Sequence, residues 1–234
     1  DVELVPMIAS GDKVQNRPLH EIGGKALWTK ELDRALDAGE IDCAVHSMKD
    51  VETIRPGHFL VAAMLERADV RDRLIGAGSV ADLKKGAIVG TASPRREAQL
   101  LRARPDLQIT LIRGNVASRL GGLQRGDVDA TLLAAAGLDR LGQTEIGSAI
   151  SVDEMLPAPS QGAVGIEILA DNATMRDILS PVDHWPTHIC VQAERELLLA
   201  LDADCQSPMA ALAVIEGEQL YLRAEILLPD GSET

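Results

Sequence analysis

The stretch on which the fold depends is Ile41-Asp42-Cys43-Ala44-Val45-His46-Ser47-Met48-Lys49-Asp50, an apolar run that ends in a polar cluster. The apolar part predicts a buried strand, and Lys49 and Asp50 follow it directly. In open α/β sheets, ligands bind just beyond the carboxyl ends of strands. A carboxylate beside a cation at such a place can exchange protons or stabilise a developing positive charge. A surface salt bridge of little energetic value is the alternative that these residues leave open.

The composition limits the class of protein. The chain has 234 residues, 46% hydrophobic and 25% charged, which is typical of a globular fold. Its formal net charge of −13 argues against a general nucleic-acid binder. No apolar run approaches the length of a membrane span and no signal peptide opens the sequence, so we expect no membrane partner. Cys43, Cys190 and Cys205 lack the spacing of a metal site, and their odd number predicts free thiols in a reducing, cytoplasmic compartment.

Strand and helix patterns alternate along much of the chain, which predicts an α/β fold with parallel strands. Strands are expected at residues 2–8, 41–48, 59–65, 74–75, 87–90, 107–112, 128–133, 161–168, 209–215 and 220–228. Helices are expected at residues 27–38, from 93 onward, and at 116–125, 134–141 and 183–201. Residues 13–24 are polar and contain glycines, and we expect a mobile loop there.

The domain organisation follows from two crossing segments. The pattern changes near residues 66–69, and a proline-rich linker occupies residues 157–160. We predict a first domain formed by residues 1–65 and 159–182, a second by 66–158 and a third by 183–234. Two α/β lobes joined by crossing segments, with a ligand between them, are typical of a hinged binding protein.

Arginines gather at three successive strand-to-helix junctions. Ser93 is a predicted N-cap, with Arg95 and Arg96 in the first helical turn. Cations are disfavoured there unless an anion lies among them, although two solvated arginines are the open alternative. The following junctions carry Arg113, Arg119 and, further along the helix, Arg140. Guanidinium groups that converge on one edge of a sheet predict a polycarboxylate or phosphate ligand.

The third cysteine lies in an unusual setting. Cys205 belongs to the polar stretch Asp202-Ala203-Asp204-Cys205-Gln206-Ser207-Pro208 and should be partly exposed, whereas Cys43 should be buried in a strand and Cys190 should pack on a helix. The acidic neighbours of Cys205 should raise the pKa of its thiol, which argues against a free nucleophile. This argument does not apply to a cysteine that is permanently alkylated by a prosthetic group, because such a cysteine does not need a reactive thiolate.

In these motifs the chain resembles the porphobilinogen deaminase family, also named hydroxymethylbilane synthases, over essentially its whole length. The shared motifs follow the family's order. They are Gly23-Gly24-Lys25, Ala44-Val45-His46-Ser47-Met48-Lys49-Asp50, Gly90-Thr91-Ala92-Ser93 with Arg95-Arg96, Arg113-Gly114-Asn115-Val116 through Arg119, Ala136-Gly137-Leu138 with Arg140, Gln161-Gly162-Ala163-Val164-Gly165-Ile166-Glu167, and Cys205-Gln206.

The resemblance implies a fold and an activity. The fold would be α/β, with two domains like those of type II periplasmic binding proteins, a cleft between them and a small α+β third domain. The activity would be that of a transferase of tetrapyrrole biosynthesis, which supplies haem and chlorophyll. It would condense four porphobilinogen units head to tail into linear hydroxymethylbilane and release ammonia at each step. The implied cofactor is dipyrromethane, attached by a thioether to Cys205. The implied partners are porphobilinogen and the growing polypyrrole chain, bound by a monomer.

The resemblance also implies the roles of individual residues. Asp50 would be the catalytic residue, and no metal would be required. The carboxylates of the substrate and cofactor would be held by Lys49, Arg95, Arg96, Arg113, Arg119, Arg140 and Ser93, with Lys25 and Gln161 as loop and hinge contacts.

Several positions depart from the family pattern. Val51-Glu52 stands where Val-Pro is usual, Ala26 and Trp28 replace glycine and phenylalanine, Glu21 occupies a position that is often basic, and Ala203-Asp204 replaces glycines. The family's first strand and helix, with their Gly-Thr-Arg-x-Ser segment, and the end of its third domain are absent. We therefore expect this sequence to be an incomplete copy of a longer chain.

Two other functions stay open at this stage. The two lobes would suit a non-catalytic binding protein for a polycarboxylate ligand, although such a protein would need neither the Cys205 region nor the Lys-Asp pair. Ehrlich's reagent would distinguish the two by revealing a bound dipyrromethane. An arginine-rich, phosphate-binding transferase is less well supported, because no glycine-rich phosphate loop follows a strand.

Overall fold

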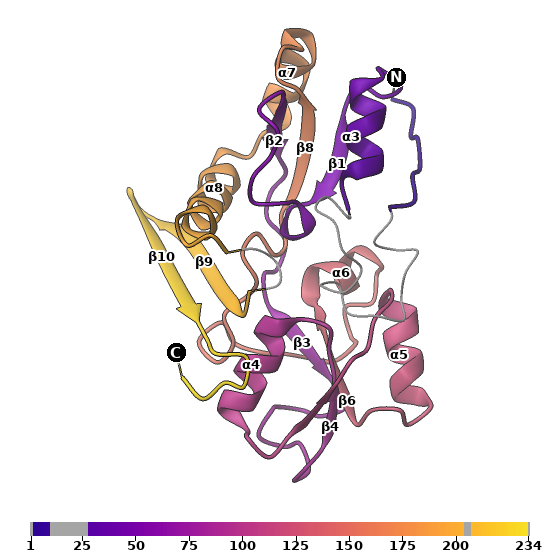
Figure 1. Cartoon of the computed structure of the whole chain (residues 1–234), viewed down its shortest axis with the longest axis vertical. Helices are drawn as coiled ribbons and strands as arrows, with labels where there is room; N and C mark the ends of the chain where they lie inside the picture. The colour runs from indigo at the N-terminus through magenta and orange to yellow at the C-terminus, as the bar shows by residue number, and fades with distance from the viewer. Residues whose placement is uncertain (1, 10–27, 204–206, 234) are drawn as a thin grey trace.

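The structure is a computed structural model that describes residues 2–9, 28–203 and 207–233. Figure 1 shows two α/β lobes one above the other, with a two-stranded hairpin and a long helix beside them. Lys25, Cys205 and the loop expected at residues 13–24 lie outside the described residues, as do Glu21 and Ala26.

The upper lobe contains a three-stranded sheet with the order β1-β8-β2. The strands are β1 (Ala44–Ser47), β8 (Val164–Leu169) and β2 (Phe59–Met64), and both outer strands are antiparallel to β8. The expectation of a parallel sheet is wrong for this lobe, because β8 returns from the other lobe and inserts between β1 and β2. Helix α3 (Lys30–Asp37) packs through Leu36 on this sheet, and α7 (Ala173–Leu179) packs through Leu179.

The lower lobe contains a five-stranded sheet with the order β5-β4-β6-β3-β7. These strands are β5 (Gln108–Thr110), β4 (Ile88–Gly90), β6 (Ala130–Ala134), β3 (Asp72–Ile75) and β7 (Ser148–Ala149). The first three are mutually parallel, as expected, while β3 is antiparallel to β6 and β7. The carboxyl ends of three strands therefore meet at one edge, where ligands bind in α/β sheets.

A helix follows each parallel strand of the lower lobe, as the sequence predicts. These helices are α4 (Pro94–Ala103), α5 (Val116–Gln124) and α6 (Ala135–Arg140). Ser93 caps α4 by accepting a hydrogen bond from the backbone N–H of Arg96, and Pro94 occupies the first turn, so this predicted N-terminus is confirmed. Val89, Leu100 and Leu132 are fully buried between the sheet and its helices.

The remaining elements form the hairpin and the long helix. Helix α8 (Trp185–Ala200) packs on β9 (Met209–Glu216), which pairs in continuous antiparallel register with β10 (Gln219–Ile226). Gly217 has a φ of 62° and makes the tight turn between the strands. Two short 3₁₀ helices, η1 (Met48–Asp50) and η2 (Ser180–Val182), complete the described elements.

The two crossing segments lie side by side. The backbone N–H of Ala68 donates to the carbonyl oxygen of Gly162 at 3.2 Å, and that of Leu65 donates to Val164 at 3.0 Å. Gly162 has a φ of 86°, and a Cβ atom there would lie 2.7 Å from the carbonyl oxygen of Ala68. Only glycine fits this close approach without strain. The domain boundaries that we place around these segments stay a prediction.

Two local expectations are wrong. Residues 2–9 form no strand, and Val2 and Leu4 are exposed, because no described strand offers partners for the backbone groups of this segment. Cys43 is half-buried rather than buried, because β1 begins only at Ala44. Cys190 is buried on α8, as expected for a packing residue.

Candidate active site

Asp50 lies at the carboxyl end of β1, in the short helix η1. Met48 anchors this turn, because its backbone N–H donates to the carbonyl oxygen of Ala163 at 3.1 Å and its side chain is fully buried. Gly165 on β8 makes room for that side chain, since a Cβ atom there would lie only 2.2 Å from the sulfur of Met48. Lys49 and Asp50 follow this anchor and are both partly buried.

Lys49 and Arg119 bring the charges of both lobes into one site. Burial lowers the pKa of the Lys49 ammonium, Arg95 and Arg96 lower it further, and Asp50 opposes the shift. Burial also lowers the pKa of Arg119 to about 10, helped by Arg96 and Arg113 and opposed by Asp50. Asp50 therefore lies within electrostatic reach of cations from its own turn and from the arginine-rich edge of the other lobe.

Asp72 holds Arg95 and Arg96 in place. Its carboxylate lies 2.8 Å from a terminal nitrogen of Arg95 and 2.7 Å from one of Arg96, and all three side chains are buried. Burial alone would raise the pKa of Asp72, but the two guanidinium groups outweigh that effect and hold it well below its usual range. The alternative of two solvated arginines is therefore wrong.

The buried arginines keep donors for a ligand. The Nε atoms of Arg95 and Arg96 are buried and have no hydrogen-bond partner among the described residues. Burying a polar group without a partner is costly, so an acceptor is expected to reach these atoms. Within the described part of the chain, five cationic side chains and two carboxylates form one electrostatically linked set. The cations are Lys49, Arg95, Arg96, Arg113 and Arg119, and the carboxylates are Asp50 and Asp72.

The other predicted residues occupy different places. Gln161 is buried at the crossing, where its side-chain amide donates to Asp72 at 2.9 Å and to the carbonyl oxygen of Val70 at 2.7 Å. Ser93 caps α4, next to the arginine pair. Arg140 is exposed at the end of α6 and donates to the carbonyl oxygen of Gly162 at 2.9 Å, so it contacts the crossing segment.

The segment that leads to Cys205 lies against the segment that leaves Asp50. The hydroxyl of Thr53 donates to the carbonyl oxygen of Ala203 at 3.2 Å. Thr53 follows Asp50 by three residues, and Ala203 precedes Cys205 by two. The third part of the chain therefore meets the first beside the carboxyl end of β1.

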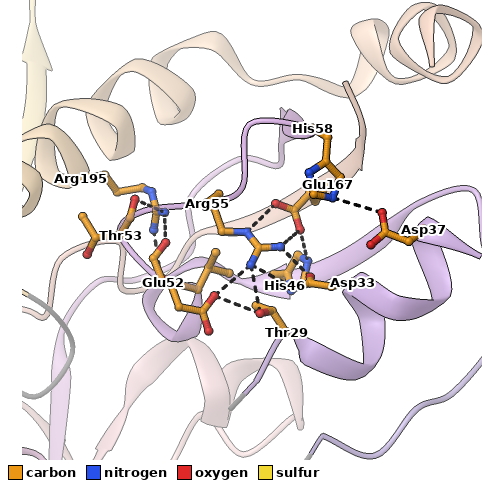
Figure 2. Close-up of polar contacts among 11 residues, drawn as sticks. Thr29, Asp33, Asp37, His46, Glu52, Thr53, Arg55, His58, Glu167 and Arg195 are labelled. Carbon is orange, nitrogen blue, oxygen red and sulfur yellow. Dashed lines mark hydrogen bonds and ion pairs between the residues drawn. The ribbon is translucent and has the colours of Figure 1, made fainter. Parts of the chain in front are cut away.

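The sequence did not predict a buried ionic cluster next to the segment that leaves Asp50. Figure 2 shows Arg55 between Glu167 of β8 and Asp33 of α3, with His46 against the same glutamate. Burial opposes the charge of Glu167, but hydrogen bonds from His46 and Arg55 outweigh it and lower the pKa of Glu167. The available signal was a histidine and a glutamate inside two strands that otherwise bury apolar residues, because such groups need partners.

Comparison with known proteins identifies the family. Residues 1–177 match the family model described as "Porphobilinogen deaminase, dipyromethane cofactor binding domain", and residues 188–234 match "Porphobilinogen deaminase, C-terminal domain". The chain belongs to the porphobilinogen deaminase family. A porphobilinogen deaminase from Sphingopyxis alaskensis is 56% identical over 238 residues, which cover 99% of this chain and 76% of that protein. One from Paracoccus denitrificans is 48% identical and covers 98% and 74%, respectively.

The likeness to solved structures is looser. A methionine-binding lipoprotein of Bacillus subtilis gives a TM-score of 0.45 at 14% identity, over 66% of this chain and 75% of that one. The second substrate-binding domain of an amino acid transporter from Streptococcus pneumoniae gives 0.42 at 17% identity, over 74% and 73%.

Membership of the porphobilinogen deaminase family confirms the expected fold class, activity and cofactor. The chain is a hydroxymethylbilane synthase, a transferase that condenses four porphobilinogen units into linear hydroxymethylbilane and uses dipyrromethane. Both alternatives left open by the sequence give way to this activity. Among the described residues no helix has the length and apolar character to cross a membrane.

The residues of the site suit this cofactor. Each of its two pyrroles carries an acetate and a propionate, so dipyrromethane presents four carboxylates. A buried, locally positive site with unpaired guanidinium N–H groups matches that set of acceptors. In a chain with a net charge of −13, such a concentration of cations is a local feature with a specific ligand to hold.

Proposed function

We propose that Asp50 is the catalytic residue of the condensation, and that the surrounding cations hold the carboxylates of porphobilinogen and of the growing chain. The observation that supports this most strongly is that Asp50, at the carboxyl end of β1, is within electrostatic reach of both Lys49 on its own turn and Arg119 on the other lobe. The reaction develops a positive charge, and a side-chain carboxylate beside it can stabilise that charge.

The chemistry defines the tasks of Asp50. The C–N bond of the aminomethyl group breaks, the amine accepts a proton and leaves as ammonia, and a methylene-pyrrole cation remains. A free pyrrole carbon of the chain end then forms the new C–C bond and loses its proton. Asp50 accepts hydrogen bonds from pyrrole N–H groups, stabilises the cation by its negative charge, and passes protons between these steps. When bound, dipyrromethane supplies the pyrrole carbon that receives the first unit.

The cationic side chains of the site are proposed to bind the carboxylates of the substrate and the cofactor. Arg95 and Arg96 are fixed by Asp72, so their remaining N–H groups are preorganised for carboxylates. Arg113 and Arg119 extend the same surface along the next strand-to-helix junction. We assign Lys49, Arg140 and Ser93 to the same carboxylate-binding set; Ser93 also caps α4. We propose Lys25 and Gln161 as contacts of the loop and the hinge.

We propose Cys205 as the attachment point of the cofactor. The family's C-terminal domain model spans this residue, and Ala203 contacts the segment that leaves Asp50. The other two thiols are poorly suited, because burial raises the pKa of both Cys43 and Cys190 and so disfavours their thiolates. We further propose that the protein acts as a monomer in the cytoplasm, which light scattering of the purified protein and fractionation of its cells would test.

The direct test is the isosteric substitution Asp50→Asn, with Asp106→Asn as the control. Asp106 is also partly buried and near an arginine, Arg104, but it lies outside the site. We expect Asp50→Asn to keep the fold and the Ehrlich-positive cofactor while turnover falls roughly 100-fold or more. The control should keep turnover within about twofold. Turnover of Asp50→Asn equal to that of the unmodified protein would remove Asp50 from the mechanism.

A further inference from the structure

The segment of residues 51–55, which leaves Asp50, is held by an arginine from the long helix α8. One terminal nitrogen of Arg195 lies 3.2 Å from the carbonyl oxygen of Val51. The other lies 2.5 Å from that of Glu52 and 3.3 Å from that of Thr53. Figure 2 shows this side chain reaching from α8 to the segment. A single guanidinium group thus binds three consecutive backbone carbonyls directly after the catalytic residue.

Arg55, the last residue of this segment, connects it to the first lobe. Its guanidinium group lies 2.8 Å from Glu167, 2.6 Å from Asp33 and 3.0 Å from Glu52, and it is largely buried. Glu52 also accepts a hydrogen bond from the hydroxyl of Thr29 at 3.0 Å. The segment is therefore bonded to the first sheet below it and to α8 beside it.

A third contact joins this segment to the approach to Cys205, since Thr53 donates to the carbonyl oxygen of Ala203. The backbone N–H of Ala203 in turn donates to the carbonyl oxygen of Leu198, at the end of α8, at 2.9 Å. Arg195 lies one helical turn before Leu198. Helix α8, the approach to Cys205 and the segment after Asp50 are thus joined in one closed set of hydrogen bonds.

We propose that Arg195 is a positioning residue, which sets the placement of Asp50 relative to the cofactor-bearing part of the chain by fixing residues 51–53. This proposal rests on the proposed roles of Asp50 and Cys205. Its physical basis is the rigid fork of guanidinium donors, which orients the carbonyls that it binds. The chain end must meet Asp50 anew in each of the four condensations, and a displacement of about 1 Å can cost roughly 100-fold in rate.

The test compares Arg195→Gln with Arg195→Lys and with the control Arg104→Gln. Arg104 is a matched control because its guanidinium group also binds several backbone carbonyls of one loop, those of Val80, Ala81, Leu83 and Lys84, and none of the segment after Asp50. The readouts are turnover per mole of loaded cofactor, KM, the melting temperature, and the covalent intermediates seen by intact-protein mass spectrometry during a single turnover.

For Arg195→Gln we expect turnover to fall about tenfold or more with KM nearly unchanged, and intermediates with one or two added units to accumulate. Arg195→Lys should recover part of the turnover, because an ammonium can still donate to one or two of the carbonyls. Arg104→Gln should lower the melting temperature without changing the distribution of intermediates. Unchanged turnover per loaded cofactor in Arg195→Gln would overturn the proposal.

A second variant covers the case in which Arg195→Gln fails to fold. Thr53→Val keeps the shape of the side chain and removes only the hydrogen bond to Ala203. We expect turnover to fall about threefold to tenfold with the cofactor retained, and an unaltered rate would again overturn the proposal. Asp50→Asn, measured in parallel, separates the two failures. If it keeps full turnover, the proposed function fails; if only the Arg195 and Thr53 variants keep it, the positioning role alone fails.

Discussion

The side-chain amide of Gln161 lies 2.9 Å from the carboxylate of Asp72. This hydrogen bond connects the crossing segment to the carboxylate that holds Arg95 and Arg96. The arginine pair, the strand β3 that carries Asp72 and the return to the first sheet therefore form one buried unit. A substitution of Asp72 should therefore weaken the binding of ligand carboxylates and also the connection between the lobes.

We expect Asp72→Asn to lower the free energy of unfolding by about 3–5 kcal/mol, because it leaves two buried guanidinium groups without their counter-charge. The loss should be smaller when the cofactor is bound, since ligand carboxylates then neutralise the arginines. Urea unfolding of the cofactor-loaded protein and of cofactor-free Cys205→Ala protein, each with and without the substitution, would measure this. An equal loss in both backgrounds would contradict the proposed role of the arginines.

The same carboxylate gives a prediction for pH. The folded pKa of Asp72 is depressed below the ordinary value of about 3.9. Its contribution to stability is therefore fully present above that value and is lost as the pH falls from about 4 towards the folded pKa. The stability difference between the unmodified protein and Asp72→Asn should be constant from pH ~6 to ~8 and should shrink below pH ~4. Denaturant titrations across this range would show a flat difference at all pH values if the prediction is wrong.

Arg119 should contribute to the binding of porphobilinogen. We expect Arg119→Gln to raise KM for porphobilinogen roughly 10- to 100-fold, the value of a charge-assisted hydrogen bond, with the fold intact. Because burial lowers the pKa of Arg119 to about 10, its charge is present below that pH and is lost above it. The KM of the unmodified protein should therefore rise as the pH passes 10, whereas that of Arg119→Gln should lack this component. Steady-state kinetics of both proteins from pH 8 to 10.5 would decide, and identical profiles would exclude Arg119.

The crossing segment gives a prediction about stability. Gly162→Ala places a Cβ atom 2.7 Å from the carbonyl oxygen of Ala68 and forces alanine to a φ of 86°. We expect a loss of about 1–3 kcal/mol in the free energy of unfolding. Gly57→Ala, whose Cβ atom would meet nothing within 4 Å, is the matched control and should be nearly neutral. Equal melting temperatures for the two variants would contradict this account of the crossing.

Much of this fold follows from patterns that are local in sequence. The three strand-to-helix units of the lower lobe were predictable because apolar runs alternate with capped helices, as at Ser93. The antiparallel arrangement of the first sheet was not, because no local pattern shows that β8 inserts between β1 and β2. The expected strand at residues 2–8 failed for the same reason, since a strand depends on a partner that its own sequence does not name.

The site was predictable in its residue types and less so in its contacts. The sequence placed Arg95 and Arg96 at a helix N-terminus and Asp50 after a strand, and in the structure Lys49, the neighbour of Asp50, is within electrostatic reach of both arginines. It did not indicate that Asp72 holds both arginines, or that Arg195 binds the segment after Asp50, because these contacts join residues far apart in the chain. Glu52, which departs from the family pattern, has its partners in Arg55 and Thr29.

The central claim is that the carboxylate of Asp50 acts on a dipyrromethane cofactor that is attached through Cys205. The most direct test is proteolytic mapping by mass spectrometry of the protein as purified. The account predicts one modified peptide, that of Cys205, heavier by two porphobilinogen units less two molecules of ammonia, while Cys43 and Cys190 stay unmodified. An unmodified Cys205 in active protein, or the adduct on either of the other two cysteines, would contradict it.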